Sequence, residues 1–318
     1  MSGAVDIPMR SILAILLGRG EPNEVWTYIV MQFRLPQALT ALMAGSVLAL
    51  CGLLLQTMFR NPLADPSILG VSSGAGVGVA LVMLLFGGGL TLGSLSVAGV
   101  AAVLAGALFG ALAVTLLMLF LSNLIKSNAL LLIAGVMIGY LSSSIIILLN
   151  FFASADGLRA YMQWGMGNFS GVTSDKLTFF ILVSAACAIS SFFLVKPLNT
   201  MVLGDSYAKN LGVNVKRFRN IVLLQTSIMT ALVTSFCGPV AFIGLAVPHI
   251  ARLFLRSDDY RTLLPTTLLA GGNVTLLCNA LCTLLPNGYI LPINVVTPIV
   301  GVPVIIYIML RKSNKYER

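Results

Sequence analysis

Few residues of this chain have the types and spacing that catalysis or metal binding requires. The single histidine, His249, follows Pro248, and we expect it to be structural. Cys278 and Cys282 lie about one helical turn apart, but no histidine or acid stands beside them to complete a zinc site. Neither a phosphate-binding GxxxxGK[ST] motif nor an HExxH motif occurs in the sequence. We therefore expect no enzymatic activity, no catalytic residue, no metal site and no cofactor bound by this chain.

The composition indicates a membrane protein. Of the 318 residues, 58% are hydrophobic and 9% are charged, whereas soluble domains carry about 25% charged residues. The formal net charge is +9, but the basic residues gather in a few loops. Membrane topology explains such loops, so we expect lipid around the protein and no nucleic acid as a partner.

Acidic residues are absent from the apolar runs. Asp65 lies in a predicted turn and Asp156 in a predicted loop. Carriers driven by protons or ions usually place an ionisable group inside a span, so this absence argues against a secondary transporter. Backbone carbonyls can also bind sodium, and a stand-alone secondary transporter therefore stays the runner-up.

Nine apolar segments approach the length of about 20 residues that crosses a bilayer. The second segment carries Gly70, Gly74 and Gly78 at four-residue spacing, which lets two helices approach closely. A short interfacial helix is expected at residues 156–164. The sequence thus predicts an all-α membrane protein, a polytopic helical bundle. Its predicted spans are 37–58, 67–86, 96–121, 129–150, 177–195, 220–237, a proline-broken 240–255, 262–285 and 293–310.

The basic residues predict the orientation. If the loops alternate between the two sides, five of the 19 lysines and arginines lie on one side and the other 14 on the opposite side. The richer side is cytoplasmic by the positive-inside rule, which puts the C-terminus in the cytoplasm. Residues 1–36 then form an extracytoplasmic segment and residues 37–318 the transmembrane domain. Because residues 1–36 would have to cross the membrane without a leading span, we expect one more helix upstream in the complete protein.

Two hydrophilic features are expected at the cytoplasmic side. Residues 196–219, here called the polar segment, mix charges with apolar residues such as Tyr207 and Leu211. This pattern favours a surface that binds a partner over a merely solvated loop. Small polar residues also gather at one end of adjacent spans and predict a weakly polar path. They are Asn61, Ser67, Ser72, Ser73, Ser127 and Asn128.

An ordered set of motifs resembles the FecCD-type permeases of ATP-driven (ABC) importers for iron-siderophore, haem and cobalamin. The resemblance begins near Val5 and extends to the C-terminus. Each motif alone is weak, but the set in this order is specific. The motifs are Arg34-Leu35-Pro36, Asn61-Pro62-Leu63-Ala64-Asp65-Pro66 with residues 69–76, Leu203-Gly204-Asp205 with Leu211-Gly212-Val213, residues 238–249, Leu291-Pro292-Ile293 and Gly301-Val302-Pro303.

The resemblance implies a fold, a set of partners and a substrate class. The fold is the type II ABC importer permease, with about ten helices per subunit against nine spans here. The partners are a second permease copy, two cytoplasmic ATP-binding subunits that hold ATP and magnesium, and a periplasmic or lipid-anchored substrate-binding protein. The expected location is the bacterial inner membrane. The expected substrate is a bulky metal chelate, an iron-siderophore or haem, with cobalamin (vitamin B12) as the alternative.

The resemblance also assigns roles to residues. Within the polar segment, residues 203–219 correspond to two short helices that lodge in a groove of the ATPase. The turns at residues 61–63 and 127–128 close the path toward the cytoplasm. The implied ATPase-coupling residues are Leu203, Gly204, Asp205, Tyr207, Leu211, Gly212, Val213, Arg217 and Phe218, and the implied path residues are Asn61, Leu63, Ser127 and Asn128.

At the outer side, Arg34 corresponds to an arginine that pairs with acids on the binding protein. The sequence departs from the family pattern at two positions, where Gln37 and Thr283 replace basic residues. Docking through charge pairs is therefore expected to be weaker at Arg34 and Gln37, or to use Arg159 or Lys176.

Overall fold

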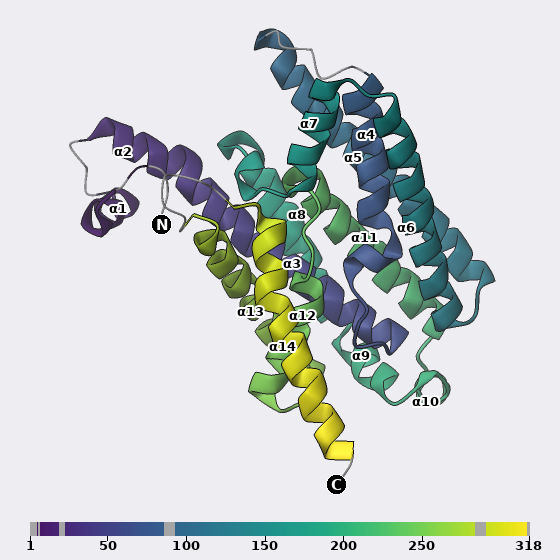
Figure 1. Cartoon of the computed structure of the whole chain (residues 1–318). Helices are drawn as coiled ribbons and strands as arrows, with labels where there is room; N and C mark the ends of the chain where they lie inside the picture. Colours follow the sequence, from purple (N-terminus) through teal and green to yellow (C-terminus); the bar gives the residue numbers. More distant parts are fainter. Residues whose placement is uncertain (1–4, 6, 19–22, 86–92, 284–290, 317–318) are drawn as a thin grey trace.

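The computed structural model describes residues 5, 7–18, 23–85, 93–283 and 291–316, which form helices joined by turns, with no strand among them (Figure 1). The elements are α1 (Met9–Leu16), α2 (Glu24–Ile29), the π-helix η1 (Val30–Arg34), α3 (Leu35–Phe59), the 3-10 helix η2 (Pro66–Leu69), α4 (Val71–Leu85), α5 (Gly93–Leu124), α6 (Asn128–Phe151), α7 (Ala155–Gly165), the 3-10 helix η3 (Phe169–Gly171), α8 (Ser174–Phe192), α9 (Val195–Val202), α10 (Asp205–Asn210), α11 (Val215–Cys237), α12 (Ile243–Leu255), α13 (Tyr260–Leu281) and α14 (Ile293–Tyr316).

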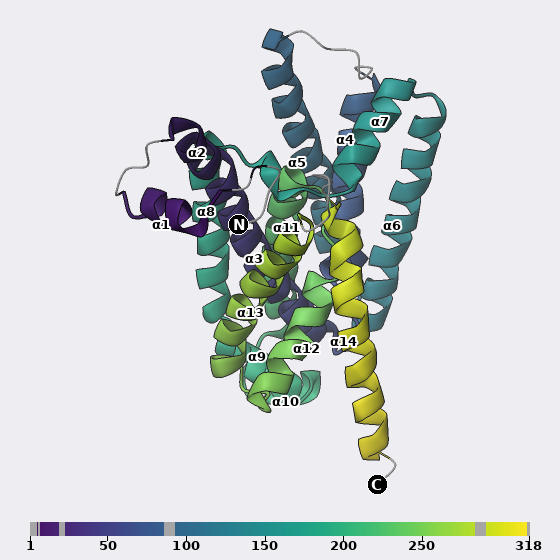
Figure 2. The ribbon, with the colours of Figure 1, turned by 60° about the vertical axis from the view of Figure 1, so that its left-hand side comes forward.

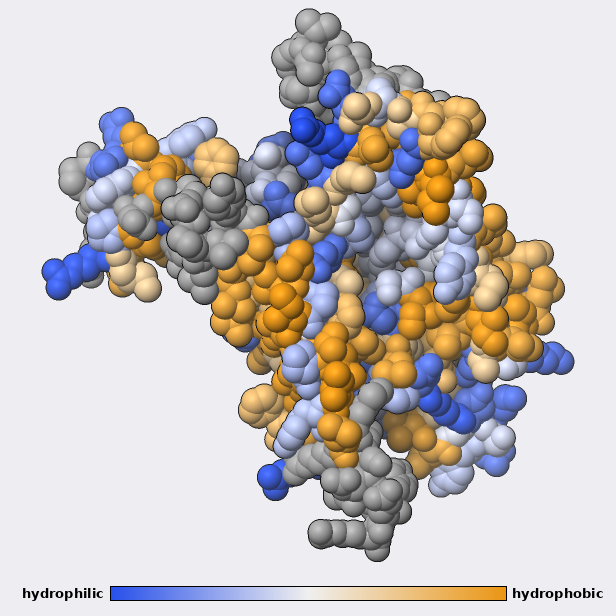
Figure 3. All heavy atoms as spheres, viewed as in Figure 1, coloured by the Kyte–Doolittle hydropathy of each residue, from blue (hydrophilic) through white to orange (hydrophobic). Residues whose placement is uncertain are grey.

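The predicted all-α membrane fold is confirmed. Within the described ranges, six helices are long and apolar enough to cross a membrane, and three shorter apolar helices accompany them in α4, α12 and α14. Each predicted span corresponds to one of these helices. The predicted span ends at residues 86 and 285 lie outside the described residues. Figure 3 shows the surface, on which hydrophobic residues cover the sides of the bundle and hydrophilic ones gather toward its ends.

Helix α3 forms the centre of the bundle. Every residue from 44 to 59 is buried, and the helix packs against α8, α11, α12 and α13. A helix that is apolar on all sides is buried on all sides, which explains why this span carries no amphipathic pattern. Figure 2 shows the same arrangement from a second direction, with α6 and α14 at the periphery.

The first span begins earlier than the sequence predicts. Helix α2, the π-helical turn η1 and α3 form one continuous helix over Glu24–Phe59, rather than a span from residue 37. Pro36 cannot donate to the carbonyl four residues earlier, and the wider π-helical turn at Val30–Arg34 accommodates that missing bond. Prolines therefore do not end the helix here.

Glycines let α4 and α5 pack backbone to backbone, as the sequence predicts. A Cβ atom on Gly78 would lie 1.9 Å from the Gly106 carbonyl oxygen, and one on Gly110 would lie 2.1 Å from the Gly74 carbonyl oxygen. Gly70 has another role, because its φ of +75° ends η2 in the left-handed region before α4 begins. Only two of the three predicted glycines therefore form the helix contact.

Two other predicted elements differ in their bounds. The broken seventh span is helical only from Ile243, because Gly238 and Phe242 have positive φ angles of +74° and +69°. The interfacial helix predicted at residues 156–164 is present as α7. In Figures 1 and 2, α7 lies at one end of the bundle and α9 and α10 lie at the other.

Candidate functional site

The polar segment folds as two short helices, α9 and α10, followed by the first turns of α11. The resemblance implied both helices within residues 203–219, whereas α9 ends at Val202, before that range. Gly204 and Gly212 border α10 with φ angles of +118° and +83°, which only glycine adopts readily. These two glycines of the predicted set therefore shape the turns.

Three large side chains of this segment point into solvent. Leu203 is 62% exposed, Tyr207 is 53% exposed and Leu211 is 55% exposed, and they recur every four residues. They lie among charged residues at the end of the bundle, away from the hydrophobic sides. An exposed apolar patch rimmed by polar residues is typical of a protein interaction surface.

Other residues of the predicted coupling set hold the segment to its own chain. Phe218 is buried in the core, and Val213 is half-buried against the same cluster. These two side chains therefore anchor the segment and are not exposed to a partner. Asp205 pairs with Arg60 at 2.5 Å, which ties α10 to the end of α3. Arg217 is exposed, and its backbone N–H donates to the Asn214 cap.

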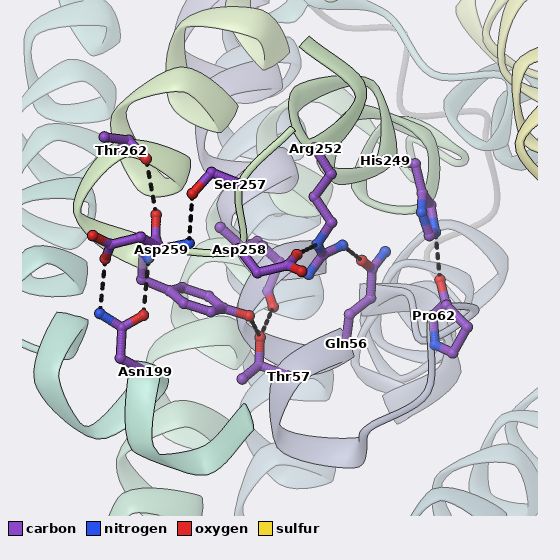
Figure 4. A network of polar contacts seen from close by, with 12 residues as sticks. Gln56, Thr57, Pro62, Asn199, His249, Arg252, Ser257, Asp258, Asp259 and Thr262 are labelled. Carbon is purple, nitrogen blue, oxygen red and sulfur yellow. Dashed lines mark hydrogen bonds and ion pairs between the residues drawn. The ribbon is translucent and has the colours of Figure 1, made fainter. Parts of the chain in front are cut away.

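A polar network joins α9 and α12 to the end of α3 (Figure 4). The Asn199 amide donates to Asp259 at 2.9 Å and accepts from the Tyr260 backbone N–H at 3.0 Å. The pKa of Asp259 lies below its usual value because the backbone N–H of Arg261 and the Asn199 side chain both donate to the carboxylate. Asp259 therefore stays ionised and fixes α9 against the start of α13.

The same network continues through α12 to the predicted gate turn. Arg252 donates to the Gln56 side-chain oxygen at 2.9 Å and pairs with Asp258 at 3.6 Å. His249 Nε2 bonds the Pro62 carbonyl at 2.8 Å. His249 thus holds the turn that contains Asn61 and Leu63, in agreement with its expected structural role (Figure 4).

The two predicted gate turns meet at the end of α3. The Asn128 amide donates to the Met58 carbonyl at 2.9 Å, and the Asn61 side chain accepts from the Leu63 N–H at 2.9 Å within its own turn. Ser127 caps α6 by accepting from the Leu130 N–H. These polar groups build turns and caps, and the Leu63 side chain remains 42% exposed.

Arg219 is a buried residue that the sequence analysis did not single out. Its guanidinium donates to the backbone carbonyl of Ser122, in the last turn of α5, and to that of Lys126, in the turn after α5. Arg219 therefore links the start of α11 to the gate turn at residues 127–128. A basic residue at the start of an apolar span was the sequence signal for this role. Its partners lie 93 and 97 residues away in the sequence, so the local pattern does not identify them.

One serine lies in a short sequence that matches the GxSxG motif of hydrolases. Gly70, Ser72 and Gly74 have the GxSxG spacing of hydrolases. The Ser72 hydroxyl lies 3.1 Å from the Thr234 hydroxyl, and the lone histidine bonds Pro62 instead. Within the part of the chain that the structure describes, the hydrogen bonds of Ser72 and His249 thus lead to different partners.

At the opposite end, the predicted docking residues face their own chain. Arg34 donates to the Val5 carbonyl, and Gln37 donates to the Asn279 side-chain oxygen at 3.0 Å. Gln37 and Asn279 line a pocket of about 170 Å³ together with Gln163 and Asn168. The polar side chains that line this pocket are amides, and the docking role of Arg34 and Gln37 stays a prediction.

The comparisons with known proteins decide the family. The model of the FecCD transport family matches residues 1–311. The chain belongs to the FecCD transport family. This FecCD protein is 36% identical to the vitamin B12 import system permease protein BtuC of Photorhabdus laumondii subsp. laumondii over 290 residues, which are 91% of this chain and 84% of that protein. BtuC of Klebsiella pneumoniae is also 36% identical, over 90% of this chain and 83% of its own.

A solved structure agrees with this membership. It shows an inward-facing conformation of a metal-chelate type ABC transporter, with a TM-score of 0.82 and 27% identity over 95% of both chains. The FecCD protein is thus a multi-span permease of an ABC importer in the inner membrane, with the predicted type II fold. The predicted family, fold and transport function are confirmed.

Proposed function

We propose that this FecCD permease carries cobalamin across the inner membrane. The support is the 36% identity to two vitamin B12 permeases over about nine-tenths of the chain. This replaces the preference for an iron-siderophore or haem, which depended on the breadth of the family alone. An iron chelate is the second candidate, because the similar solved structure is of a metal-chelate type transporter.

The energy for transport comes from two separate subunits that bind ATP and magnesium and contact α9 and α10. The observation that carries this proposal is the exposed patch of Leu203, Tyr207 and Leu211 at the polar end of the bundle. A partner seated on this patch would act on the gate through two connections. One is the Asn199–Asp259 contact with the network of Figure 4, and the other is Arg219.

The remaining partners follow from the same family. A second copy of the chain completes the path, and a substrate-binding protein, periplasmic or lipid-anchored, docks near Arg34 and Gln37. The path closes at Asn61, Leu63, Ser127 and Asn128. In this proposal the residues before the continuous helix Glu24–Phe59 face outward, and the C-terminus and α9–α10 lie in the cytoplasm.

Uptake by reconstituted complexes tests the substrate. The permease is placed in liposomes with its ATPase and binding protein, and uptake of radiolabelled cyanocobalamin is compared with that of a ferric siderophore and of haem. We expect ATP-dependent uptake of cyanocobalamin above that of both iron ligands. Uptake of an iron ligand without cyanocobalamin uptake would move the assignment to the second candidate.

A further inference from the structure

A groove of about 500 Å³ lies between the last turns of α5 and the first turns of α11. One part of its lining is cationic and polar, formed by Lys216, Arg217 and Asn220. The other part is aliphatic, formed by Leu119, Ile221 and Leu224. The groove therefore changes from charged to apolar along its length.

The polar part of the groove carries uncompensated positive charge. Lys216 and Arg217 are both exposed, and the ion pairs recorded for the described residues use Arg60 and Arg252 instead. Both cations lie in the first turn of α11, where the helix dipole adds partial positive charge. An anion in this part of the groove would thus be stabilised.

An exposed aliphatic stripe continues the groove along α11. Arg217, Ile221, Leu224 and Ile228 recur at spacings of four, three and four on one exposed face of α11, and the three aliphatic side chains are 39%, 45% and 42% exposed. At a rise of 1.5 Å per residue, the aliphatic part from Ile221 to Ile228 is about 10 Å long. It covers roughly two thirds of one leaflet, which is about half of a 30 Å hydrocarbon core.

Helix α5 supplies the facing wall of the groove with Leu119 and Asn123. Asn123 lies one turn after Leu119, near the charged end, and accepts a hydrogen bond from the Asn220 amide. Both walls therefore present apolar side chains first and polar groups at the same end.

We propose that this groove binds an anionic phospholipid. Lys216 and Arg217 bind its phosphate, and the stripe on α11 holds an acyl chain. The combination of an anion site with an adjoining aliphatic track favours a lipid over a soluble anion, which would leave the track uncovered. It also distinguishes the groove from the patch of Leu203, Tyr207 and Leu211, which has no such track. In the orientation proposed above, this lipid belongs to the cytoplasmic leaflet of the membrane.

Native mass spectrometry of the purified full-length permease tests this site. The protein is incubated with phosphatidylglycerol, with phosphatidylcholine and with glycerol 3-phosphate, which has the phosphate but no acyl chain. We expect preferential retention of phosphatidylglycerol. The double variant Lys216→Gln with Arg217→Gln should lose roughly tenfold or more of this binding, since each cation near an anionic lipid contributes substantially. Leu224→Gln should weaken retention while leaving the charge unchanged.

The matched control removes two other exposed cations of the same end, with Lys196→Gln and Lys209→Gln. This control should retain the lipid as the unmodified protein does. Equal retention of both phospholipids, or unchanged retention by the Lys216/Arg217 variant, would overturn the proposal. Binding of glycerol 3-phosphate as strong as that of the lipid would also overturn it. So would a Lys216/Arg217 variant that loses ATPase binding while its lipid binding stays intact.

Discussion

At the scale of single residues, long-range polar contacts stabilise the end of the bundle that carries α9 and α10. Arg219, Asn128 and Asn199 each bond a partner that is distant in sequence. In a bilayer protein such groups lie where spans end, and each satisfies carbonyls or caps that would otherwise lack a partner. Asn128 attaches the start of α6 to α3, Arg219 attaches α11 to the end of α5, and Asn199 attaches α9 to the start of α13.

Replacing Arg219 by alanine should destabilise the protein. The change leaves the carbonyls of Ser122 and Lys126 without their donor in a largely buried position, which costs about 1–3 kcal/mol. Thermal unfolding of the detergent-solubilised protein measures the effect. Lys209→Ala is the control, because Lys209 is exposed on α10. Equal melting of the two variants would contradict the role of Arg219.

Arg34→Glu should weaken docking of the binding protein, because a repulsive charge replaces an attractive one. The effect should shrink as salt rises, since exposed charge pairs are screened within about 10 Å at 0.1 M. Titration of the binding protein onto the reconstituted permease at two salt concentrations measures it. Arg10→Glu serves as the control, and affinity that is indifferent to the Arg34 reversal would remove Arg34 from the docking site.

At the scale of elements, the sequence predicts the spans well and their polar connections poorly. Apolar runs reveal α5, α6 and α13, because the bilayer demands such runs. The early start of the first span was missed because Arg34 and Pro36 signal the entrance of a span, whereas the helix continues through both residues. The role of Asn199 was missed because nothing local marks its partners 60 and 61 residues away. Gly74 and Gly78 were predictable from spacing alone.

Gly78→Ala should separate α4 from α5. The new Cβ would meet the Gly106 backbone oxygen at 1.9 Å, and backbone cannot rotate away as a side chain can. We expect a loss of roughly 1–3 kcal/mol, as for other overpacked cores. Gly139→Ala in α6 is the matched control, because its nearest neighbour would lie at 3.8 Å. Similar melting temperatures for both variants would refute close α4–α5 packing.

At the scale of the whole molecule, the bundle presents different surfaces at its two ends. One end carries the exposed patch of Leu203, Tyr207 and Leu211, and the polar network of Figure 4 lies at the same end. The opposite end carries Arg34 and the amide-lined pocket of Gln37. Our proposal places the ATPase on the first end and the binding protein on the second, so we expect ATP hydrolysis by a partner to drive transport.

Leu211→Asp should uncouple the permease from its ATPase. Leu211 is exposed, so membrane insertion should stay normal while co-purification of the ATPase falls. Ser206→Asp is the matched control, because it adds the same charge at an exposed position of α10. Gly212→Pro should act like Leu211→Asp, since proline cannot adopt the φ of +83°. Equal recovery of the ATPase with Leu211→Asp and with Ser206→Asp would argue against this patch.

The most direct test of the central claim is solute uptake into liposomes that contain the permease with or without its ATPase. Both preparations are supplied with the binding protein and either with ATP or with a proton or sodium gradient. We expect uptake only where the ATPase and ATP are both present. Uptake by the permease alone under an ion gradient would contradict it.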